Sequence, residues 1–304
     1  MEKTVSETPG RFRCRPGAGG AVYATLASTG PDSAKAAEAI EVTALPELPE
    51  VEIYTRYFAL HALDQLIAGV DVLDERILEV PRKRLRSALV GQRFRSVRRH
   101  GKHLFADLGK SWLHLHFGMT GDLLSYGDPK ERPRFARVVF DFENGSHLAY
   151  DDMRLFGIVG LVPSPETYIA EHRLGPDPLA ASFRLPLFRE LMAKRRGAIK
   201  ALLMSQEFVA GIGNLYADEA LFQASIHPRR LAETLRPDAV KAIYTSIRSI
   251  LRSTILRKAR GATAPAGWLV QHRELGERCP RCGGTIRRTV VGGRTTFFCG
   301  KHQK

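Results

Sequence analysis

Apolar positions follow two different periodicities along the chain. Residues 51–66 read VEIYTRYFALHALDQL, with apolar side chains at helical spacing behind two prolines, which predicts a helix. Residues 68–162 instead contain short alternating or continuous apolar runs separated by Gly, Asp and Asn, namely HLFADLG, WLHLHFGM, RVVFDFENG and HLAYDDM. Several short strands at such close intervals are typical of an antiparallel sandwich or barrel.

Beyond residue 172 the pattern becomes helical. The Pro-rich segment RLGPDPLAASF (173–183) predicts a domain link, and three segments with helical periodicity follow within residues 186–260, interrupted at VAGIGN and IHPRR. The chain from residue 273 onward is short, turn-rich and basic. We therefore expect a β domain over 46–172, a linker over 173–185, a helical domain over 186–268 and a separate C-terminal unit over 269–304.

Residues 1–45 differ from the rest. They are rich in Ala, Gly, Ser and Thr without sustained apolar periodicity, and this composition predicts a disordered extension. The segment lacks the apolar core of a secretory signal, and its five acidic residues argue against an organellar transit peptide. Because it carries five basic and five acidic side chains, the whole net charge of +14 belongs to residues 46–304. Such a charge favours a polyanionic partner, although a basic surface kept for solubility is the alternative.

Overall composition narrows the class of protein. Hydrophobic residues make up 44% of the chain and charged residues 26%, as in ordinary globular proteins, and no window is apolar for long enough to suggest a membrane span. Three of the four cysteines lie in the last 26 residues, which is a local metal pattern and not a disulfide framework.

That pattern has two halves. Cys279-Pro-Arg-Cys282 is followed after 16 residues by Cys299-Gly-Lys-His302. Two ligand pairs of this spacing match a closed tetrahedral Zn²⁺ site, and a closed site is structural because no position stays open for water. The intervening TVVGGRTTFFC suits a hairpin with a Gly-Gly turn. Chance clustering of three thiols and a histidine is the weaker explanation.

The sequence GIGNLYADEALF (211–222) places glycines directly ahead of a predicted helix. Backbone N–H groups at a helix N-terminus attract phosphate, although such a loop also occurs purely for packing. With AKRRGAIK nearby and a zinc hairpin following, phosphate binding is the better hypothesis.

Several motifs occur in the order of a known family: PELPEVE (46–52), RRHGKHLF (98–105), HFGMTG (116–121), DDMRLFG (151–157), GIGNLYADEALF and GRTTFFC. Over residues 46–304 the chain resembles the DNA glycosylases/AP lyases of the formamidopyrimidine-DNA glycosylase and endonuclease VIII family. The resemblance implies an α+β multidomain protein, with an N-terminal antiparallel β-sandwich, a helix-two-turn-helix domain and a C-terminal zinc-finger β-hairpin. It also implies a base-excision repair enzyme that flips oxidised bases out of damaged double-stranded DNA, acting as a monomer in the bacterial cytoplasm and nucleoid.

Residue roles follow from the same resemblance. Pro46 matches the family's N-terminal nucleophile, whose secondary amine attacks C1′ of the sugar and forms a Schiff base. Glu47 matches the acid beside it that protonates the sugar oxygen. Contacts to the phosphates around the lesion are implied for Lys102, Asn214 and Arg294, and a basic DNA contact ahead of the helix pair for Arg195. Filling of the space left by the flipped base is implied for Met119, Arg154 and Phe156. Without the resemblance, Met119 and Phe156 would more often be core residues, and for Glu52 we expect only a helix-start charge.

The chain departs from the family pattern at several positions. His302 replaces a fourth cysteine, Leu155 replaces a second arginine, and Phe135 stands where a histidine is common. Only 17 residues separate Gly261 from Cys279, which resembles the shorter loop of the endonuclease VIII side. We therefore expect formamidopyrimidines or oxidised pyrimidines to be better substrates than 8-oxoguanine.

The most consequential departure precedes Pro46. With Leu45 attached, the nitrogen of Pro46 is a tertiary amide and cannot attack C1′. Leu45 as the true initiator explains this best, while proteolytic removal of residues 1–45 and a non-catalytic binder of damaged or bent DNA are the alternatives. A zinc-containing RNA-binding protein is a weaker hypothesis, because it gives Glu47 and Lys102 no role.

Overall fold

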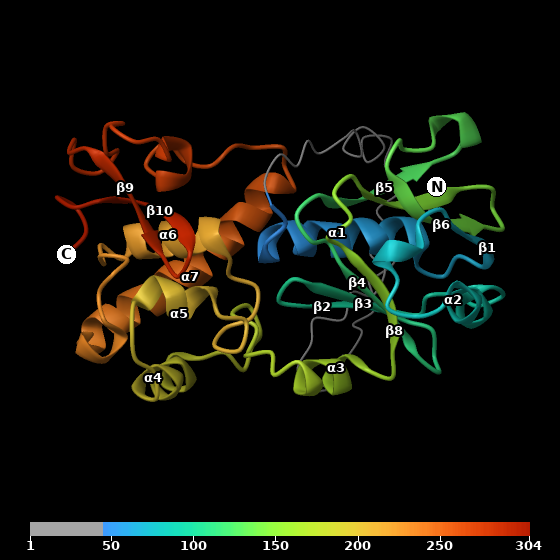
Figure 1. Ribbon diagram of the computed structural model, residues 1–304, viewed down its shortest axis with the longest axis horizontal. Coiled ribbons are helices and arrows are strands. Elements are labelled where there is room, and N and C mark those ends of the chain that lie inside the picture. The colour runs from blue at the N-terminus through green and yellow to red at the C-terminus, as the bar shows by residue number, and fades with distance from the viewer. Residues whose placement is uncertain (1–44) are drawn as a thin grey trace, which may run out of the picture.

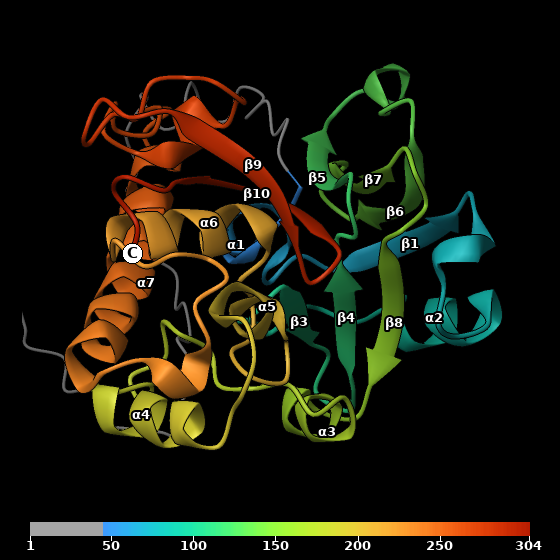
Figure 2. The same ribbon diagram turned by 60° about the vertical axis from the view of Figure 1, so that its left-hand side comes forward.

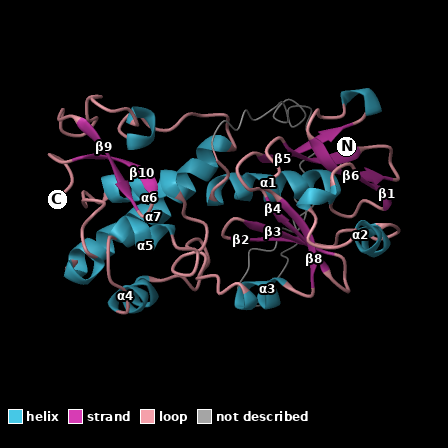
Figure 3. Ribbon diagram, viewed as in Figure 1, coloured by secondary structure: helices cyan, strands magenta, loops and turns pink. Residues whose placement is uncertain are grey.

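The computed structural model describes residues 45–304, so the predicted extension over residues 1–45 lies outside the described residues except for Leu45. A β-rich lobe and a helical lobe lie next to each other, with helix α1 (Leu48–Ala62) reaching from one to the other (Figures 1 and 3). Among the described residues, no helix is long and apolar enough to cross a membrane.

Helix α1 contributes to both lobes. Pro49 lies in its first turn, where a missing backbone N–H costs nothing. Val51, Tyr54 and Phe58 are buried in the core of the β lobe, whereas Leu48 and Ile53 are buried in the core of the helical lobe. The boundary between the first two predicted domains therefore does not separate two independent cores.

Two four-stranded antiparallel sheets form the β lobe. One has the order β1 (Ile67–Val72), β6 (Ala136–Phe142), β7 (His147–Asp152), β5 (Gly121–Tyr126), and the other β2 (Val97–His100), β3 (His103–Asp107), β4 (Trp112–His116), β8 (Ile158–Val162). Alternate residues from both sheets, such as Leu104 and Phe140, meet in one core, as the period of two predicts. Helices α2 (Arg82–Leu89) and α3 (Pro165–Glu171) flank the sheets, with short 3₁₀ turns at Glu75–Ile77 and Pro129–Glu131.

The helical lobe consists of α4 (Leu185–Ala193), α5 (Ile199–Met204), α6 (Asn214–Gln223) and α7 (Pro237–Lys258), with a 3₁₀ turn at Ala232–Thr234. Its core is apolar at helical spacing along α7, for example at Ile243, Ile247 and Ile250.

The C-terminal unit is a hairpin of β9 (Ile286–Val291) and β10 (Arg294–Cys299), preceded by a 3₁₀ turn at Leu269–His272. Gly292 and Gly293 both have positive φ, 56° and 72°, which is the backbone that a two-residue hairpin turn of this kind needs. The hairpin lies along the helical lobe and its turn points toward the β lobe (Figure 2). The predicted α+β architecture of sandwich, helical domain and zinc-finger hairpin is thus confirmed.

Candidate active site

Pro46 is buried and precedes Glu47, the N-cap residue of α1, while Leu45 before it is 47% exposed. The backbone N–H of Leu48 donates to the carbonyl of Gly211 at 3.0 Å, which fixes the start of α1 against the loop that precedes α6. The Pro46 nitrogen is acylated by Leu45 in this chain. Any chemistry at that nitrogen therefore requires the 45–46 peptide bond to be absent.

Glu47 is 3% exposed and its carboxylate lies on the N-terminus of α6. It accepts hydrogen bonds from the backbone N–H groups of Gly213 (2.7 Å), Leu215 (2.8 Å) and Tyr216 (3.3 Å). Burial raises the pKa of Glu47, and the charge of Lys102 and the backbone donors offset this only in part. The donors that the sequence suggested for phosphate are thus occupied by a carboxylate, because a helix N-terminus favours any anion.

The glycines of GIGN allow this close approach. A Cβ on Gly213 would lie 2.5 Å from Oε1 of Glu47. Gly211 has φ +97°, and a Cβ there would lie 2.7 Å from Cδ1 of Leu48. These glycines therefore serve the contact between α1 and α6 directly.

Glu50 is a site residue that sequence reasoning missed. Its Oε1 accepts from the Tyr216 hydroxyl (2.8 Å) and lies 3.2 Å from Nζ of Lys258, and its Oε2 accepts from the N–H of Glu47 (3.1 Å). Glu50 thus ties the residue beside Pro46 to both α6 and α7. The repeated carboxylates of PELPEVE were the only signal, and they do not identify these distant partners.

Lys102 lies in the turn between β2 and β3, half-buried and facing this carboxylate region. Burial lowers the pKa of Lys102, the charges of Glu47 and Glu50 oppose this, and the charge of Arg294 lowers it further. Arg294 is exposed at the first position of β10, next to the Gly-Gly turn. The structure therefore brings Glu47, Lys102 and Arg294 from three distant segments into one electrostatic environment.

Asn214 begins α6, and its Oδ1 accepts from Nζ of Lys200 at 2.7 Å. Lys200 is fully buried, and its ammonium also donates to Thr296 Oγ1 (2.7 Å) and pairs with Asp218 (2.7 Å). Lys200 thus joins α5, α6 and β10 beside the proposed phosphate contacts. Sequence reasoning missed it, although a lysine within the apolar run AIKALLM is an indication.

The three predicted space-filling residues lie on neighbouring loops. Phe156 is 55% exposed, Met119 is half-buried outside the core clusters, and the Arg154 guanidinium lies 5.1 Å from the centre of the Phe156 ring. Buried Asp152 holds these loops, since it accepts from Thr120 Oγ1 (2.5 Å) and the N–H of Gly157 (2.7 Å). Because Phe156 and Arg154 are exposed and Met119 is only half-buried, a surface contact is a better interpretation of these three residues than a place in the core.

Two further predicted positions are more isolated. Arg195 follows α4 and its guanidinium lies 5.9 Å from the ring centre of Phe208. Leu155, which stands in place of the family's second arginine, has φ +56° and packs against the core of the β lobe. Its side chain is therefore partly buried against that core.

The expectation for Glu52 was wrong. Its side chain is 6% exposed and pairs with Arg99 (2.9 Å) and Arg56 (3.1 Å). It lies in the second turn of α1, so it forms a buried ion pair and does not serve as a charge at the helix start.

The thiols of Cys279, Cys282 and Cys299 converge, with their Sγ atoms within 4.8 Å of one another and 3.5 Å between Cys282 and Cys299. In a tetrahedral site with Zn–S distances of about 2.3 Å, neighbouring sulfurs are about 3.8 Å apart, so the three thiols fit a structural Zn²⁺. His302 does not join this cluster. Its Nε2 lies 2.9 Å from the carbonyl of Phe222 and 3.3 Å from Ser225 Oγ, and its ring packs against Phe222. The structure therefore brings together three of the four predicted ligands, and His302 as the fourth stays a prediction.

Three family models match successive segments of the chain. Residues 45–159 match the formamidopyrimidine-DNA glycosylase N-terminal domain, residues 174–265 its H2TH domain, and residues 276–301 the zinc finger found in FPG and IleRS. The first match begins one residue before Pro46. The boundaries agree with the order sandwich, helical domain, zinc hairpin.

Individual relatives extend this picture. The formamidopyrimidine-DNA glycosylase of Pelotomaculum thermopropionicum is 35% identical over 78% of this chain and 91% of its own length, and that of Chloroflexus aurantiacus is 36% identical over 82% and 94%. Two solved structures of the Lactococcus lactis enzyme, bound to DNA with an AP site and to FAPY-dG DNA, share 30% identity. Both have TM-scores of 0.77 and match 85% of this chain. The matches cover 99% of the chain in the first structure and 100% of the chain in the second. These names support the formamidopyrimidine-DNA glycosylase side, whereas the short 261–279 segment suggested endonuclease VIII. The chain belongs to the formamidopyrimidine-DNA glycosylase family.

Proposed function

We propose that this protein is a base-excision repair DNA glycosylase with AP lyase activity that removes oxidised bases from duplex DNA. The observation that carries the proposal is the convergence of Glu47, Lys102 and Arg294 at the Pro46 end of α1. Family membership and the DNA-bound structures of relatives support DNA as the partner. The net charge of +14 supports it independently.

The proposed chemistry starts from a free Pro46 amine. Its lone pair attacks C1′ of the damaged nucleotide, the glycosidic bond breaks, and the base leaves with that bonding pair. The proton of the attacking nitrogen passes to the departing base, which frees the nitrogen lone pair. Glu47 gives a proton to the sugar ring oxygen, the C1′–O4′ bond breaks with its electrons going to that oxygen, and the nitrogen lone pair forms the C1′=N⁺ Schiff base. Abstraction of a proton from C2′ then expels the 3′ phosphate by β-elimination, which nicks the strand.

The surrounding residues suit the handling of charge in this reaction. A pKa of Glu47 raised by burial keeps a larger fraction of its carboxyl protonated near neutral pH, which an acid catalyst needs. Lys102, Asn214, Arg195 and Arg294 would contact phosphates, while Met119, Arg154 and Phe156 would occupy the space of the flipped base. The zinc ion would hold the hairpin so that Arg294 keeps its place.

We further propose that the active form begins at Pro46, because the lone pair of an acylated nitrogen is delocalised into the carbonyl group and is not nucleophilic. The test compares a protein beginning at Pro46 after removal of an initiator methionine with the chain that retains residues 1–45, in a host without processing. Borohydride should trap the first covalently on DNA containing an abasic site, since reduction makes the Schiff base permanent. The second should bind the same DNA without an adduct.

N-terminal sequencing accompanies this experiment. An adduct formed by protein that still begins at Met1 would mean that another amine is the nucleophile. In that case the proposed role of Pro46 would be wrong, although the DNA-binding role would stand.

On substrate, we propose better excision of formamidopyrimidines and oxidised pyrimidines than of 8-oxoguanine. The segment between Gly261 and Cys279 is short, and its hydrogen bonds tie it to itself and to α6: Gln271 to the Ala264 carbonyl (2.7 Å), His272 to Ala266 (2.9 Å) and Val270 N–H to Glu219 (2.8 Å). Little chain is left to close over an oxidised purine. Excision rates on single-lesion duplexes decide this, and a clear preference for 8-oxoguanine opposite cytosine would contradict it.

We also propose that the protein acts on DNA as a monomer in the bacterial nucleoid, as the family resemblance implies. Light scattering of the complex with a short lesion duplex should give one protein per duplex. A two-to-one mass at saturating DNA would contradict the monomer.

A further inference from the structure

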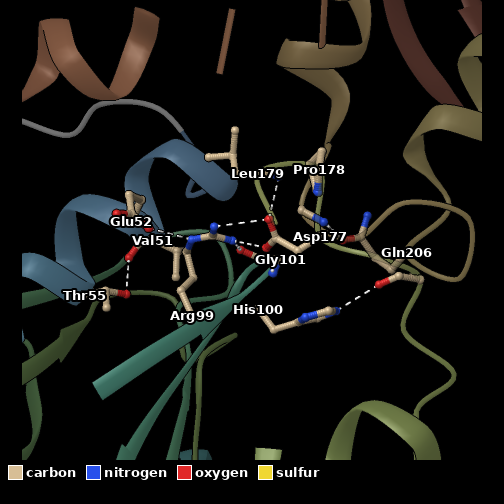
Figure 4. A network of polar contacts seen from close by, with 12 residues as sticks. Val51, Glu52, Thr55, Arg99, His100, Gly101, Asp177, Pro178, Leu179 and Gln206 are labelled. Atoms are coloured by element: carbon tan, nitrogen blue, oxygen red, sulfur yellow. Dashed lines mark hydrogen bonds and ion pairs between the residues drawn. The ribbon is translucent and has the colours of Figure 1, made fainter. Parts of the chain in front are cut away.

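Three charged side chains meet in a buried junction where α1, β2 and the predicted linker come together. Arg99 of β2 lies between Glu52 of α1 and Asp177 of the linker (Figure 4). The side chains of all three are 6–7% exposed. Nε of Arg99 donates to Glu52 at 2.9 Å, and its Nη1 and Nη2 both donate to Asp177. A paired, hydrogen-bonded arrangement of this kind is what makes buried charge tolerable.

Asp177 does more than neutralise Arg99. Its Oδ2 accepts from the backbone N–H of Gly101 at 2.8 Å, and its Oδ1 accepts from that of Leu179 at 2.8 Å. Nη1 of Arg99 also donates to the carbonyl of Gly101 at 3.1 Å. Both backbone polar groups of Gly101 are therefore held by the Arg99–Asp177 pair, directly beside Lys102.

Residues 175 and 176 of the linker also bind the loop that precedes α6. The N–H of Gly175 donates to the Gln206 carbonyl (2.8 Å), and the N–H of Ala210 donates to the Pro176 carbonyl (3.1 Å). The loop containing Ala210 runs on into Gly213 and α6, whose N-terminus holds the carboxylate of Glu47. On the other side, Nε2 of His100 lies 2.9 Å from the Gly175 carbonyl.

Residues 175–177 therefore lie between the turn that carries Lys102 and the loop that leads to Glu47's binding site. The two loops also touch: Gly101 has φ +56°, and a Cβ there would lie 2.8 Å from Cβ of Ala210. Close packing alone sets a minimum separation, whereas the hydrogen bonds of residues 175–177 prevent the loops from moving apart. The segment predicted as a simple link is a structural part of the site.

We propose that Asp177 is a positioning residue, which fixes the Lys102 turn against the loop before α6 and so sets the distance between the Lys102 ammonium and the Glu47 carboxylate. The inference rests on the proposed function, because it assigns Asp177 an effect on that reaction. A neutral residue at 177 cannot replace it, since one carboxylate here satisfies both a guanidinium and a backbone N–H. Burial would raise the pKa of Asp177, but Arg99 holds it below its ordinary value, so the carboxylate is ionised at neutral pH.

The experiment must separate positioning from stability. Asp177→Leu takes one of two carboxylates from Arg99, and Arg99→Leu leaves Asp177 buried without a counter-charge, so both should melt at lower temperature than the parent. The double variant Arg99→Leu/Asp177→Leu removes both charges of that pair, while Glu52 keeps its ion pair with Arg56 (3.1 Å), so it should regain part of the melting temperature. It still lacks the hydrogen bonds to Gly101, so its borohydride-trapping rate at saturating enzyme should stay at least 10-fold below that of the parent, all in protein beginning at Pro46.

The pH dependence of the trapping rate provides a second readout. Because Lys102 lowers the pKa of Glu47, displacing Lys102 should move the alkaline limb of the trapping rate to higher pH. Lys102→Met should give the same displacement. The matched control is Glu166→Gln. It removes the ion pair (2.5 Å) of Arg98, which precedes Arg99 on β2. This variant should trap at a rate within twofold of that of the parent, with an unchanged pH profile.

The salt dependence of DNA binding tests the role of Asp177 independently of the trapping reaction. If Lys102 contacts a phosphate, the double variant and Lys102→Met should each lower the salt slope of binding to a tetrahydrofuran-containing duplex by about one unit. A stable double variant with the parent's salt slope, or with its trapping rate and pH profile, would overturn the positioning role. A parent that binds but never traps would instead overturn the proposed lyase function, and the salt slope would still decide the role of Asp177.

Discussion

The side chain of Lys200 is fully buried, and its ammonium donates a hydrogen bond to Oδ1 of Asn214 at 2.7 Å. Its ammonium lies 2.7 Å from Asp218, which is also paired with Arg273 at 2.9 Å. Burial lowers the pKa of Lys200 and raises that of Asp218, so each depends on the other's charge. The pair fixes α6 and β10 next to the proposed phosphate contacts.

We predict that Lys200→Met destabilises the protein by about 3 kcal/mol, because it leaves Asp218 with Arg273 as its one charged partner and removes the donor to Asn214. Affinity for a tetrahydrofuran-containing duplex should fall as well, since Asn214 is then free to turn. Lys194→Met provides the stability control, because the Lys194–Glu190 pair is exposed and should contribute little to stability. Urea unfolding and binding titrations measure both effects, and a Lys200→Met protein as stable as Lys194→Met would contradict the prediction.

At the scale of elements, one face of the β2–β3–β4 sheet is lined with histidines. Nδ1 of His103 lies 3.0 Å from Nε2 of His114, and the rings of His103 and His116 are 4.9 Å apart. Burial lowers the pKa of all three, that of His116 to about 4, with Lys102 adding to the effect at His116. Glu79, 3.5 Å from Nδ1 of His114, opposes it there. From α3, Tyr168 and His172 cover this face.

These shifts give the folding stability a pH dependence of definite sign. A histidine whose pKa is lower in the folded state stabilises the fold fully above its unfolded pKa of about 6.5, and that contribution is lost as pH falls toward the folded value. His116 alone would account for about 2 kcal/mol between pH 6.5 and 5. Asp122, whose pKa burial raises to about 6, acts in the opposite direction over part of this range.

Because Asp122 contributes equally to both proteins, the informative quantity is the difference between the parent and His114→Phe. We predict that the variant loses less stability than the parent between pH 7 and 5, since one of the buried histidines no longer has to remain neutral. Urea unfolding at the two pH values measures it. Equal losses in parent and variant would show that His114 does not carry an acid-sensitive share of the stability.

At the scale of the whole molecule, what could be predicted from sequence was local. The strand alternation, the Gly-Gly hairpin and the Cys-x-x-Cys spacing each specify their structure within a few residues, and all three are found. Glu47, by contrast, binds N–H groups 166 to 169 residues further along the chain. No periodicity records such a pairing.

Contacts between distant segments explain the wrong expectation for Glu52 and the contacts that sequence patterns do not indicate. The partner of Glu52, Arg99, lies 47 residues away, and the Pro-rich segment that predicts a domain link gives no sign of the contacts of Asp177. His302 has the spacing of a ligand, yet its ring is held by Phe222, which is 80 residues distant. Contacts between segments that are distant in the sequence decide these positions, and a sequence pattern does not specify which segments will meet.

The charge distribution of the whole molecule leads to the last prediction. All of the +14 lies in residues 46–304, and three cationic side chains, Lys102, Arg195 and Arg294, are proposed to contact phosphates. With a slope of about −0.9 per neutralised phosphate, three contacts give a slope of roughly −2.7 in log K against log salt concentration. Affinity for a lesion duplex should therefore fall about 40-fold between 50 and 200 mM salt.

Arg294 allows a test of a single contact. Arg294→Ala should weaken binding and reduce the magnitude of the slope by about one, because one fewer counterion is released, while the zinc content stays at one per chain. Fluorescence anisotropy across a salt series measures the slope, and elemental analysis the zinc. A parent slope near zero would contradict the proposed phosphate contacts as a group. An unchanged slope in Arg294→Ala would remove Arg294 from them, because a side chain that neutralises a phosphate must release a counterion when it binds.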